Sequence, residues 1–307
     1  MFQRIVLLLL VLLSAATVFA QKTSARSTAK TVPVVNSALS LDERVKAALA
    51  DFRGNAWIYA KNLDNGREYA WRADERVRTA STIKLPIMVE VFAQVAAGKV
   101  KWTDKVTLKG KQGGSGVLGE FSEGTELDLK TLTNLMIVVS DNTATNLILD
   151  RITAEAVNSR MDALGFPNIR SLRKIGGGGD SRAGLDPNNK IFGLGISTPR
   201  EMARLLEMLE RGEVVSKEAS AEMIAILRRQ QYNNGIGRGL LDTTPSATKS
   251  GALDRLRSDV GIVYTRRGRI VMAITIDDMP VVHYSEENPG LAMLWRLSQI
   301  LQDGLAK

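Results

Sequence analysis

The 307-residue sequence has no cysteine and a single histidine, and only 5% of its residues are aromatic. Without cysteine there is no disulfide framework and no residue for a bacterial lipid anchor, so a hydrophobic core must stabilise the fold. Zinc catalysis is disfavoured because thiolate ligands and a second histidine are missing. A Ser-His-Asp triad would depend on His283, which follows the last predicted strand, and no Gly-x-Ser-x-Gly elbow occurs. We therefore expect no metal and no other cofactor.

Acidic residues are also in the minority, since 33 Asp and Glu against 41 Lys and Arg give a formal charge of +8. A basic surface favours anionic partners such as the cell envelope or nucleic acid. Here the charges are scattered, and aromatic residues do not interleave them in a recognised binding motif. We expect no nucleic-acid partner.

The N-terminal segment has the pattern of an export signal. Residues 1–20 contain a basic Arg4, an apolar stretch at 5–13 and small residues ending at Ala20, as in a cleaved secretory signal. The apolar stretch is too short to span a bilayer comfortably. Residues 21–40 are rich in Ser, Thr, Ala and Lys without periodicity, which predicts a flexible leader. We expect a periplasmic or secreted protein, without a stable membrane anchor after cleavage, whose folded domain covers 41–307.

Four Ser-x-x-Lys strings occur, and their context selects the one formed by Ser81 and Lys84. Apolar residues recur at helical spacing over 81–98, so Ser81 should begin a helix and share a face with Lys84. A serine hydroxyl needs an adjacent base to act as a nucleophile. Lys84 can be that base if burial and a second cation lower its pKa, whereas a helix cap and a solvated lysine are the alternative. The other strings begin at Ser27, Ser171 and Ser246.

Two further motifs follow in order. Ser140, Asp141 and Asn142 lie between an apolar run and a helical stretch, where side chains can point into a cleft or simply cap the second helix. Lys249, Ser250 and Gly251 precede two β-rich runs at 259–264 and 269–276, which predicts that they lie on the first strand of a three-strand meander. A strand edge offers backbone donors to a substrate, and a glycine lets the substrate approach closely.

This ordered set resembles the class A β-lactamase and penicillin-binding protein superfamily, whose signature is Ser-x-x-Lys, Ser-Asp-Asn and Lys-Thr-Gly. Ser250 replaces the threonine and keeps a hydroxyl. The string 140–146 and the helix start 197–199 extend the match, which covers most of the mature chain from near Trp57 to the last helix.

The resemblance implies a role for each motif residue. Ser81 would be the acylated nucleophile, Lys84 its base and Ser140 a proton shuttle to the leaving nitrogen. Lys249 would keep Lys84 neutral and attract the substrate carboxylate. Asn142, Ser250 and Gly251 would bind substrate, and the backbone N–H groups of Ser81 and Ala252 would form the oxyanion hole. The family also places a basic residue near the next strand. We favour Arg257 over Arg255 as this carboxylate anchor.

One element of the family is missing. Class A enzymes carry Glu-x-x-x-Asn on a loop, and that glutamate activates the water that releases the acyl group. Between residues 151 and 199 the only glutamate is Glu155, which falls inside a predicted helix. Asp186 is the nearest substitute and Asp180 a weaker one, although Asp-Pro and Gly-Asp are also ordinary turn formers. Acylation is therefore better supported than rapid release.

The order of elements predicts an α+β fold. A hairpin at 56–63 and 67–72 surrounds Asp64-Asn65-Gly66, helical segments follow from 81 to about 164, and further helices are predicted at 199–210, 221–230 and 289–301. Two early and three late strands imply a five-stranded antiparallel sheet flanked by helices, with an inserted all-helical domain. We assign about 41–80 and 215–307 to the sheet part and about 81–214 to the helical part, with the site in the cleft between them.

Three functions fit this pattern. The favoured one is a serine β-lactamase that opens the lactam amide through an acyl-enzyme on Ser81, with slow or atypical release. A peptidoglycan D,D-peptidase or related serine hydrolase would be acylated by β-lactams and remain trapped. A non-catalytic penicillin-recognising module of the envelope would keep the pocket without turnover. The expected partner is a small β-lactam or a peptidoglycan-derived substrate.

Overall fold

The computed structural model describes residues 39–240 and 243–306. The predicted signal and nearly all of the predicted leader lie outside these residues. Within the described ranges, no helix combines the length and the apolar character needed to cross a bilayer.

A five-stranded antiparallel sheet organises the chain, in the order β2-β1-β10-β9-β8. The hairpin predicted around Asp64-Asn65-Gly66 and the late meander are both confirmed, and they join where β1 pairs with β10. The strands are β1 (Asn55–Asn62), β2 (Glu68–Trp71), β8 (Ser246–Leu253), β9 (Leu256–Thr265) and β10 (Gly268–Asp277). The predicted fold class is therefore confirmed.

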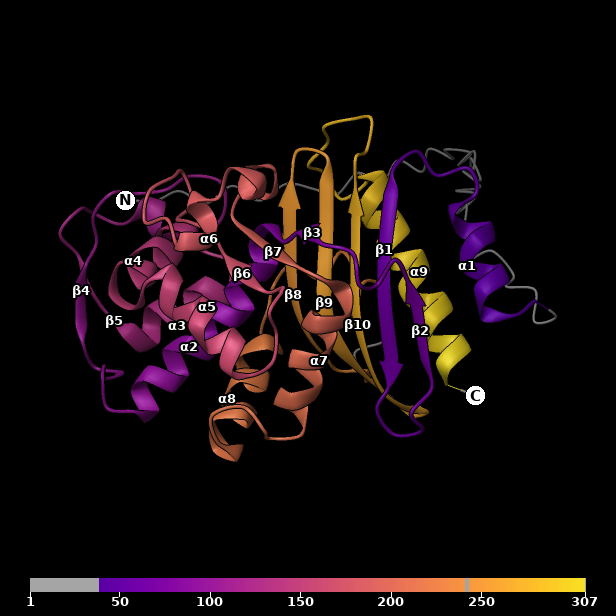
Figure 1. The fold of residues 1–307 in the computed structure, drawn as a ribbon, viewed down its shortest axis with the longest axis horizontal. Helices are drawn as coiled ribbons and strands as arrows, with labels where there is room; N and C mark the ends of the chain where they lie inside the picture. The colour runs from indigo at the N-terminus through magenta and orange to yellow at the C-terminus, as the bar shows by residue number, and fades with distance from the viewer. Residues whose placement is uncertain (1–38, 241–242, 307) are drawn as a thin grey trace, which may run out of the picture. The chain divides into compact units, whose positions relative to one another are not determined.

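Helices cover both faces of the sheet. Because side chains alternate along a strand, successive residues of β10 pack against different faces. Ile270, Met272 and Ile274 belong to the core that includes α1 (Leu41–Leu49) and α9 (Pro289–Leu305). Val271 and Ala273 belong to the core on the opposite face, which includes α7 (Pro199–Glu210) and α8 (Lys217–Leu227). Figure 1 shows α9 and α7 on the two sides of the strands.

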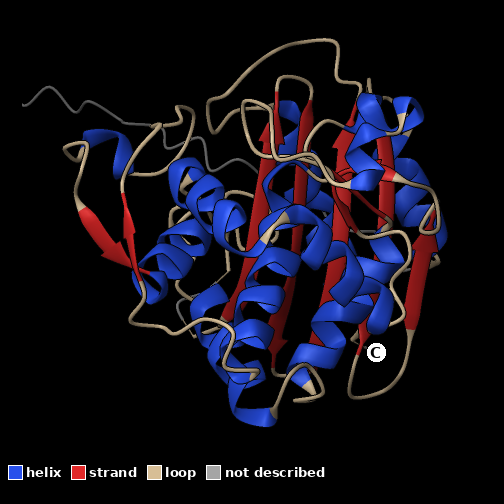
Figure 2. Cartoon of the chain, turned by 60° about the vertical axis from the view of Figure 1, so that its left-hand side comes forward, coloured by secondary structure: helices blue, strands red, loops and turns tan. Residues whose placement is uncertain are grey.

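The helical region shares this second core with the sheet. Its central helix is α2 (Lys84–Ala96), in which every residue from Lys84 to Ala93 is buried, as expected of a helix that is surrounded by others. Figure 2 shows the helices packed in front of the strands. The surrounding helices are α3 (Leu129–Val138), α4 (Asn142–Ile152), α5 (Ala154–Ala163) and the short α6 (Arg182–Leu185).

Several local predictions needed correction. The helix predicted at 221–230 begins at Lys217, because the Ser216 side chain caps it by accepting a hydrogen bond from the Ala219 N–H. The helix predicted from residue 81 begins as a 3₁₀ turn, η1 (Ala80–Ile83). Two small sheets were not predicted, because their strands have only two or three residues: β3 (Val77–Arg78), β7 (Gly195–Ser197) and β6 (Arg170–Ser171) in one, and β4 (Lys105–Thr107) and β5 (Glu126–Asp128) in the other.

Candidate active site

Ser81 lies in η1, directly beneath the edge strand β8. Ala80, which precedes it, has a φ of 46°, a left-handed conformation that costs energy for a residue other than glycine. Gly251 of β8 packs against this turn so closely that an added Cβ would lie 3.0 Å from the Ser81 nitrogen and 2.8 Å from the Thr79 carbonyl oxygen. Only glycine fits there. The structure thus brings the first and third motifs into contact.

Lys84 is fully buried at the start of α2, so the alternative of a solvated lysine is wrong. Its amine donates to the Ser140 carbonyl at 2.5 Å, to Asn142 Oδ1 at 2.8 Å and to Ser140 Oγ at 3.1 Å. Burial lowers the pKa of Lys84 well below its usual value, and the nearby charge of Lys249 lowers it further, while Asp141 opposes the shift. A neutral amine can donate to two of these oxygens and still offer a lone pair to a proton.

Ser140 connects the two lysines. Its Oγ lies 3.1 Å from the Lys84 amine and 3.0 Å from the Lys249 amine. The residue has a φ of 53°, an uncommon conformation for serine, at the junction of α3 and α4. Strain of this kind is tolerated where the surrounding structure fixes it, and it often accompanies a functional site. A hydroxyl between two amines can pass a proton in either direction.

Lys249 projects from β8 and is also fully buried. Its amine donates to Ser140 Oγ and to the Ser250 carbonyl at 2.7 Å. Burial lowers the pKa of Lys249 to about 7, although the Asp259 carboxylate pulls it upward. The amine therefore titrates near neutral pH. Below that pH it carries the positive charge that an anionic substrate requires.

Two residues that the sequence reasoning missed hold this centre together. Asp141 accepts N–H bonds from Val117 at 2.7 Å and Leu118 at 2.8 Å, which fixes the 113–118 loop to the start of α4. Ser115 on that loop donates to the Ser140 carbonyl at 2.7 Å. The Ser-Asp-Asn string itself pointed to Asp141, whereas Ser115 stood in a Gly-Gly-Ser-Gly stretch that suggested only a loop.

Ser250 and Ala252, two of the predicted substrate contacts, lie on β8. Ser250 Oγ accepts a hydrogen bond from Gln230 Nε2 at 2.9 Å, and no sequence motif indicated this partner. Ala252 is exposed and follows Gly251, so its backbone lies next to the Ser81 turn. Asn142 is already engaged, since its Oδ1 accepts from Lys84 and its Nδ2 donates to the Gly113 carbonyl at 2.8 Å.

Arg257 has surroundings that the anchoring role did not foresee. Its side chain is buried, and Nη1 donates to the carbonyls of Leu253 and Leu256, both at 2.6 Å. Nη2 donates to the His283 carbonyl, and the guanidinium stacks on the Tyr284 ring at 4.8 Å. Arg255 is exposed. The choice between the two arginines as a substrate anchor stays a prediction.

The His283 imidazole forms its hydrogen bond with the neighbouring Ser285, at 2.9 Å. His283 is half-buried, and this hydrogen bond involves no member of the three motifs.

The loop that is expected to carry the water-activating acid differs from the buried centre around Ser140. Asp186 is exposed, and its carboxylate accepts a hydrogen bond from the Asn188 N–H at 2.9 Å, which caps η3 (Pro187–Phe192). Glu155 lies in α5, as predicted, and pairs with Arg182 at 2.6 Å. The loop is tied to α4 through Asn146, whose side chain makes two 2.9 Å bonds to the backbone of Ile175. Asn146 therefore holds an apolar residue, Ile175, at this point of the loop.

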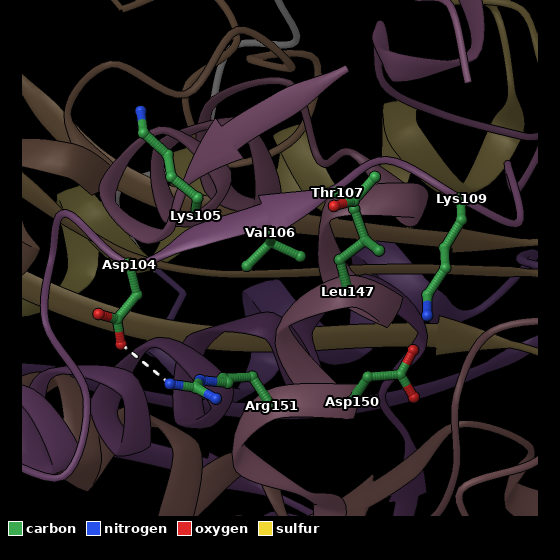
Figure 3. A pocket seen from close by; sticks show the side chains of 8 residues that line it. All are labelled: Asp104, Lys105, Val106, Thr107, Lys109, Leu147, Asp150 and Arg151. Carbon is green, nitrogen blue, oxygen red and sulfur yellow. Dashed lines mark hydrogen bonds and ion pairs between the residues drawn. The ribbon is translucent and has the colours of Figure 1, made fainter. Parts of the chain in front are cut away.

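A separate hollow of about 410 Å³ lies between β4 and α4 (Figure 3). Of its charged side chains, Arg151 pairs with Asp104 at 3.0 Å within the lining, and Asp150 pairs with Lys174 outside the lining at 2.7 Å. None of the residues that line it belongs to the three motifs. The motif geometry, and not the size of this hollow, identifies the candidate site.

Comparison with known proteins agrees with the site. A profile described as the β-lactamase enzyme family matches residues 40–305. β-Lactamase SME-1 of Serratia marcescens is 25% identical over 185 residues, which is 58% of this chain and 60% of the relative. A β-lactamase of Rhodobacter capsulatus is 24% identical over 215 residues, 67% of this chain and 70% of the relative.

Solved structures extend the likeness. A β-lactamase from Sphaerobacter thermophilus is 30% identical with a TM-score of 0.75, covering 87% of this chain and 96% of its own. PBP-A is 26% identical with a TM-score of 0.73, covering 86% and 94%. A PBP-A variant with the same identity was solved as an acyl-enzyme complex with penicillin G. With its three motifs assembled around Ser81 and a family profile that spans nearly all of the described residues, this chain belongs to the β-lactamase enzyme family.

Proposed function

We propose that this protein is an exported serine hydrolase that opens the β-lactam amide through an acyl-enzyme on Ser81 and releases the acyl group slowly. The observation that carries the proposal is the position of Ser140 Oγ, 3.1 Å from the Lys84 amine and 3.0 Å from the Lys249 amine. This arrangement provides both a base of lowered pKa and a route for a proton. The basic, apolar and small-residue pattern of residues 1–20 supports export.

Acylation then follows from the chain's own groups. The neutral Lys84 amine takes the proton of the Ser81 hydroxyl, and Ser81 Oγ attacks the lactam carbonyl carbon. The backbone N–H groups of Ser81 and Ala252 stabilise the oxyanion. As the C–N bond breaks, Ser140 donates its proton to the leaving nitrogen and regains one from a lysine amine. The product is an ester between Ser81 and the opened lactam.

Substrate binding relies on the β8 edge. A cationic Lys249 attracts the substrate carboxylate, and the Ser250 hydroxyl, which is held by Gln230, can donate a hydrogen bond to it. The lowered pKa of Lys249 makes this attraction sensitive to pH near neutrality. Asn142 would orient the acylamide of the substrate.

Hydrolysis of the ester requires an activated water, and this half of the reaction has weaker support. The sequence offers Asp186 as the nearest substitute for the missing glutamate, yet its exposed carboxylate caps η3. The residue that Asn146 fixes beside α4 is Ile175, which cannot accept a proton. An acyl-enzyme should therefore accumulate. A D,D-peptidase-like activity on peptidoglycan is the second candidate, and the likeness to PBP-A favours it.

Intact-mass spectrometry after mixing with penicillin G tests the proposal. We expect a mass increase equal to one penicillin, located on the peptide that contains Ser81 and absent from the Ser81→Ala variant. Later loss of the adduct would support the lactamase, and a permanent adduct would support the peptidase. Absence of any adduct on the wild-type protein at millimolar penicillin, together with no hydrolysis of the penicillin, would overturn acylation as its chemistry.

A further inference from the structure

Asp259 is a buried acid on β9 to which the mechanism above gives no role. It is 1% exposed, and its Oδ1 has no hydrogen-bond partner among the described residues. Burying a carboxylate costs several kcal/mol unless other groups compensate for the lost water. A chain that keeps such a group next to its Lys-Ser-Gly strand therefore gains something from the charge.

The register of the sheet places Asp259 directly beside the substrate edge. Asp259 pairs with Ser250, and the neighbouring pair joins Val260 to Lys249. Directly paired residues of an antiparallel ladder point to the same face, so Asp259 shares a face with Ser250 while Lys249 points to the other. Asp259 and Lys249 are therefore diagonal neighbours in the ladder between β9 and the edge strand β8, which is the strand nearest the helical region in Figure 1.

The same carboxylate fastens the segment that runs along this edge. Its Oδ2 accepts a hydrogen bond from the Ile236 N–H at 2.8 Å. An added Cβ at Gly235 would lie 2.4 Å from Oδ2, so the segment can approach only because that residue is glycine. Together with the bond between Gln230 and Ser250, this fixes residues 230–236 to the sheet at two points, one on β8 and one on β9.

Lys249 is the charged partner that the surroundings of Asp259 favour, because the two nearby arginines have other contacts. Arg257 on β9 is bound by backbone carbonyls, and Arg238 stacks over Trp295 at 5.0 Å. β10 places the uncharged Ile274 opposite Asp259, and α9 contributes Ser298, which bonds the Ile236 carbonyl at 3.2 Å. Burial raises the pKa of Asp259 to about 7, although the Ile236 N–H and the Lys249 charge pull it down. Each charged form therefore supports the other.

We propose that Asp259 is a positioning residue for the Ser81 site, whose buried carboxylate keeps Lys249 on the edge strand cationic and holds residues 230–236 against the sheet. This inference rests on the proposed function, because it concerns the charge that attracts the substrate. A cationic Lys249 also holds Lys84 neutral, so the effect of Asp259 reaches the base through Lys249.

Asp259→Asn tests the proposal, since it keeps the shape of the side chain and removes the charge. Without its counter-charge the pKa of Lys249 should fall, and Lys84, facing a less cationic neighbour, should titrate at higher pH. The bell-shaped pH profile of penicillin acylation should narrow from both sides, with the alkaline limb moving down by roughly one pH unit. Asp303→Asn, which removes one negative charge from α9, is the matched control and should leave the profile unchanged.

A substrate-free measurement separates this inference from the proposed function. Titration of the Lys249 amine by ¹⁵N NMR of lysine-labelled protein should give a pKa about one unit lower in Asp259→Asn than in the wild type. A wild-type Lys249 amine that titrates well below about pH 7, and is therefore neutral where acylation is measured, would overturn the inference even if the variant does not fold. An equal rate loss at every pH, with the Lys249 titration unmoved, would show a packing role alone and would also overturn it.

Discussion

Two regions of this protein differ in how firmly they hold their functional groups. At the acylating centre, Lys84 and Lys249 are both fully buried and share Ser140, which has a constrained backbone. In the loop that follows α5, Leu185 is 68% exposed, and Asp186 beside it is exposed and spends its carboxylate on a helix cap. The buried centre around Ser140 holds its proton donors and acceptors in fixed positions, whereas the segment around Asp186 is an exposed surface loop. In the proposed reaction, this contrast places the formation of the acyl-enzyme and its release under separate structural control.

The largest effect should come from removing the nucleophile. Ser81→Ala should abolish acylation, a loss of at least about 10³-fold, while thermal stability changes little because Ser81 is only partly buried. Adduct formation by mass spectrometry and a melting curve check both points. Ser27, Ser171 and Ser246 changed to Ala should each acylate like the wild type. A large loss at any of them would mean that the helix context selected the wrong serine.

The contact between β8 and the Ser81 turn should be nearly as sensitive. Gly251→Ala places a methyl group 3.0 Å from the Ser81 nitrogen, so the strand must move away from the oxyanion donors. A displacement of about 1 Å can cost on the order of 10²-fold in rate. Gly119→Ala is the matched control, because an added Cβ there meets nothing within 4 Å. Stopped-flow acylation of both variants should separate them, and equal rates would contradict the close-approach argument.

Arg257 should matter more for affinity than for the chemical step. Arg257→Ala should weaken apparent affinity for a carboxylate-bearing lactam by about 1.5 to 3 kcal/mol, the usual range for a hydrogen bond to a charged group. Because its guanidinium also binds the Leu253 and Leu256 carbonyls, a lower melting temperature should accompany the change. Arg255→Ala, at an exposed position, serves as the comparison. Impairment at Arg255 together with normal kinetics at Arg257 would move the anchor to Arg255.

The pH dependence should distinguish anionic from neutral substrates. As pH rises through about 7, the pKa of Lys249, the amine loses its proton and its attraction for a carboxylate. We expect the second-order acylation constant of penicillin G to fall by up to about tenfold for each pH unit above that pKa. A lactam methyl ester lacks the negative charge and should decline less. Parallel profiles for acid and ester would show that Lys249 does not select the carboxylate.

The smallest effect is expected at Asp186. If its carboxylate were the base, Asp186→Asn would prolong the adduct and Asp186→Glu would shorten it by restoring reach. The Asp186 carboxylate is exposed to solvent and caps η3, and asparagine caps helices about as well. We therefore expect adduct lifetimes in both variants within about twofold of the wild-type value. Rapid-quench decay of the adduct in the three proteins measures this. A longer lifetime in the Asn variant and a shorter one in the Glu variant would assign the base.

The sequence predicted the sheet, because its signals are local, and it selected three motifs that the structure brings together. The Asp64-Asn65-Gly66 turn, the β-rich runs that form β9 and β10, and the helical spacing after Ser81 each reflect short-range chemistry. Asp259 and Gln230 escaped notice because their importance depends on partners brought together by the fold, such as Ile236 and Ser250. The small sheets were missed because strands of two or three residues have no period. The sequence pattern carries no information on which distant residues come into contact at the sheet.

The central claim is that formation of the acyl-enzyme is supported by a buried, pre-arranged centre while its release is not. Rapid-quench mass spectrometry of the wild-type protein with penicillin G measures both steps in one experiment. We predict a burst of close to one adduct per protein, followed by decay at least about tenfold slower than formation, because Asp186, the acid predicted to activate the hydrolytic water, is exposed and caps η3. Decay as fast as formation, with no adduct accumulating during turnover, would contradict the account.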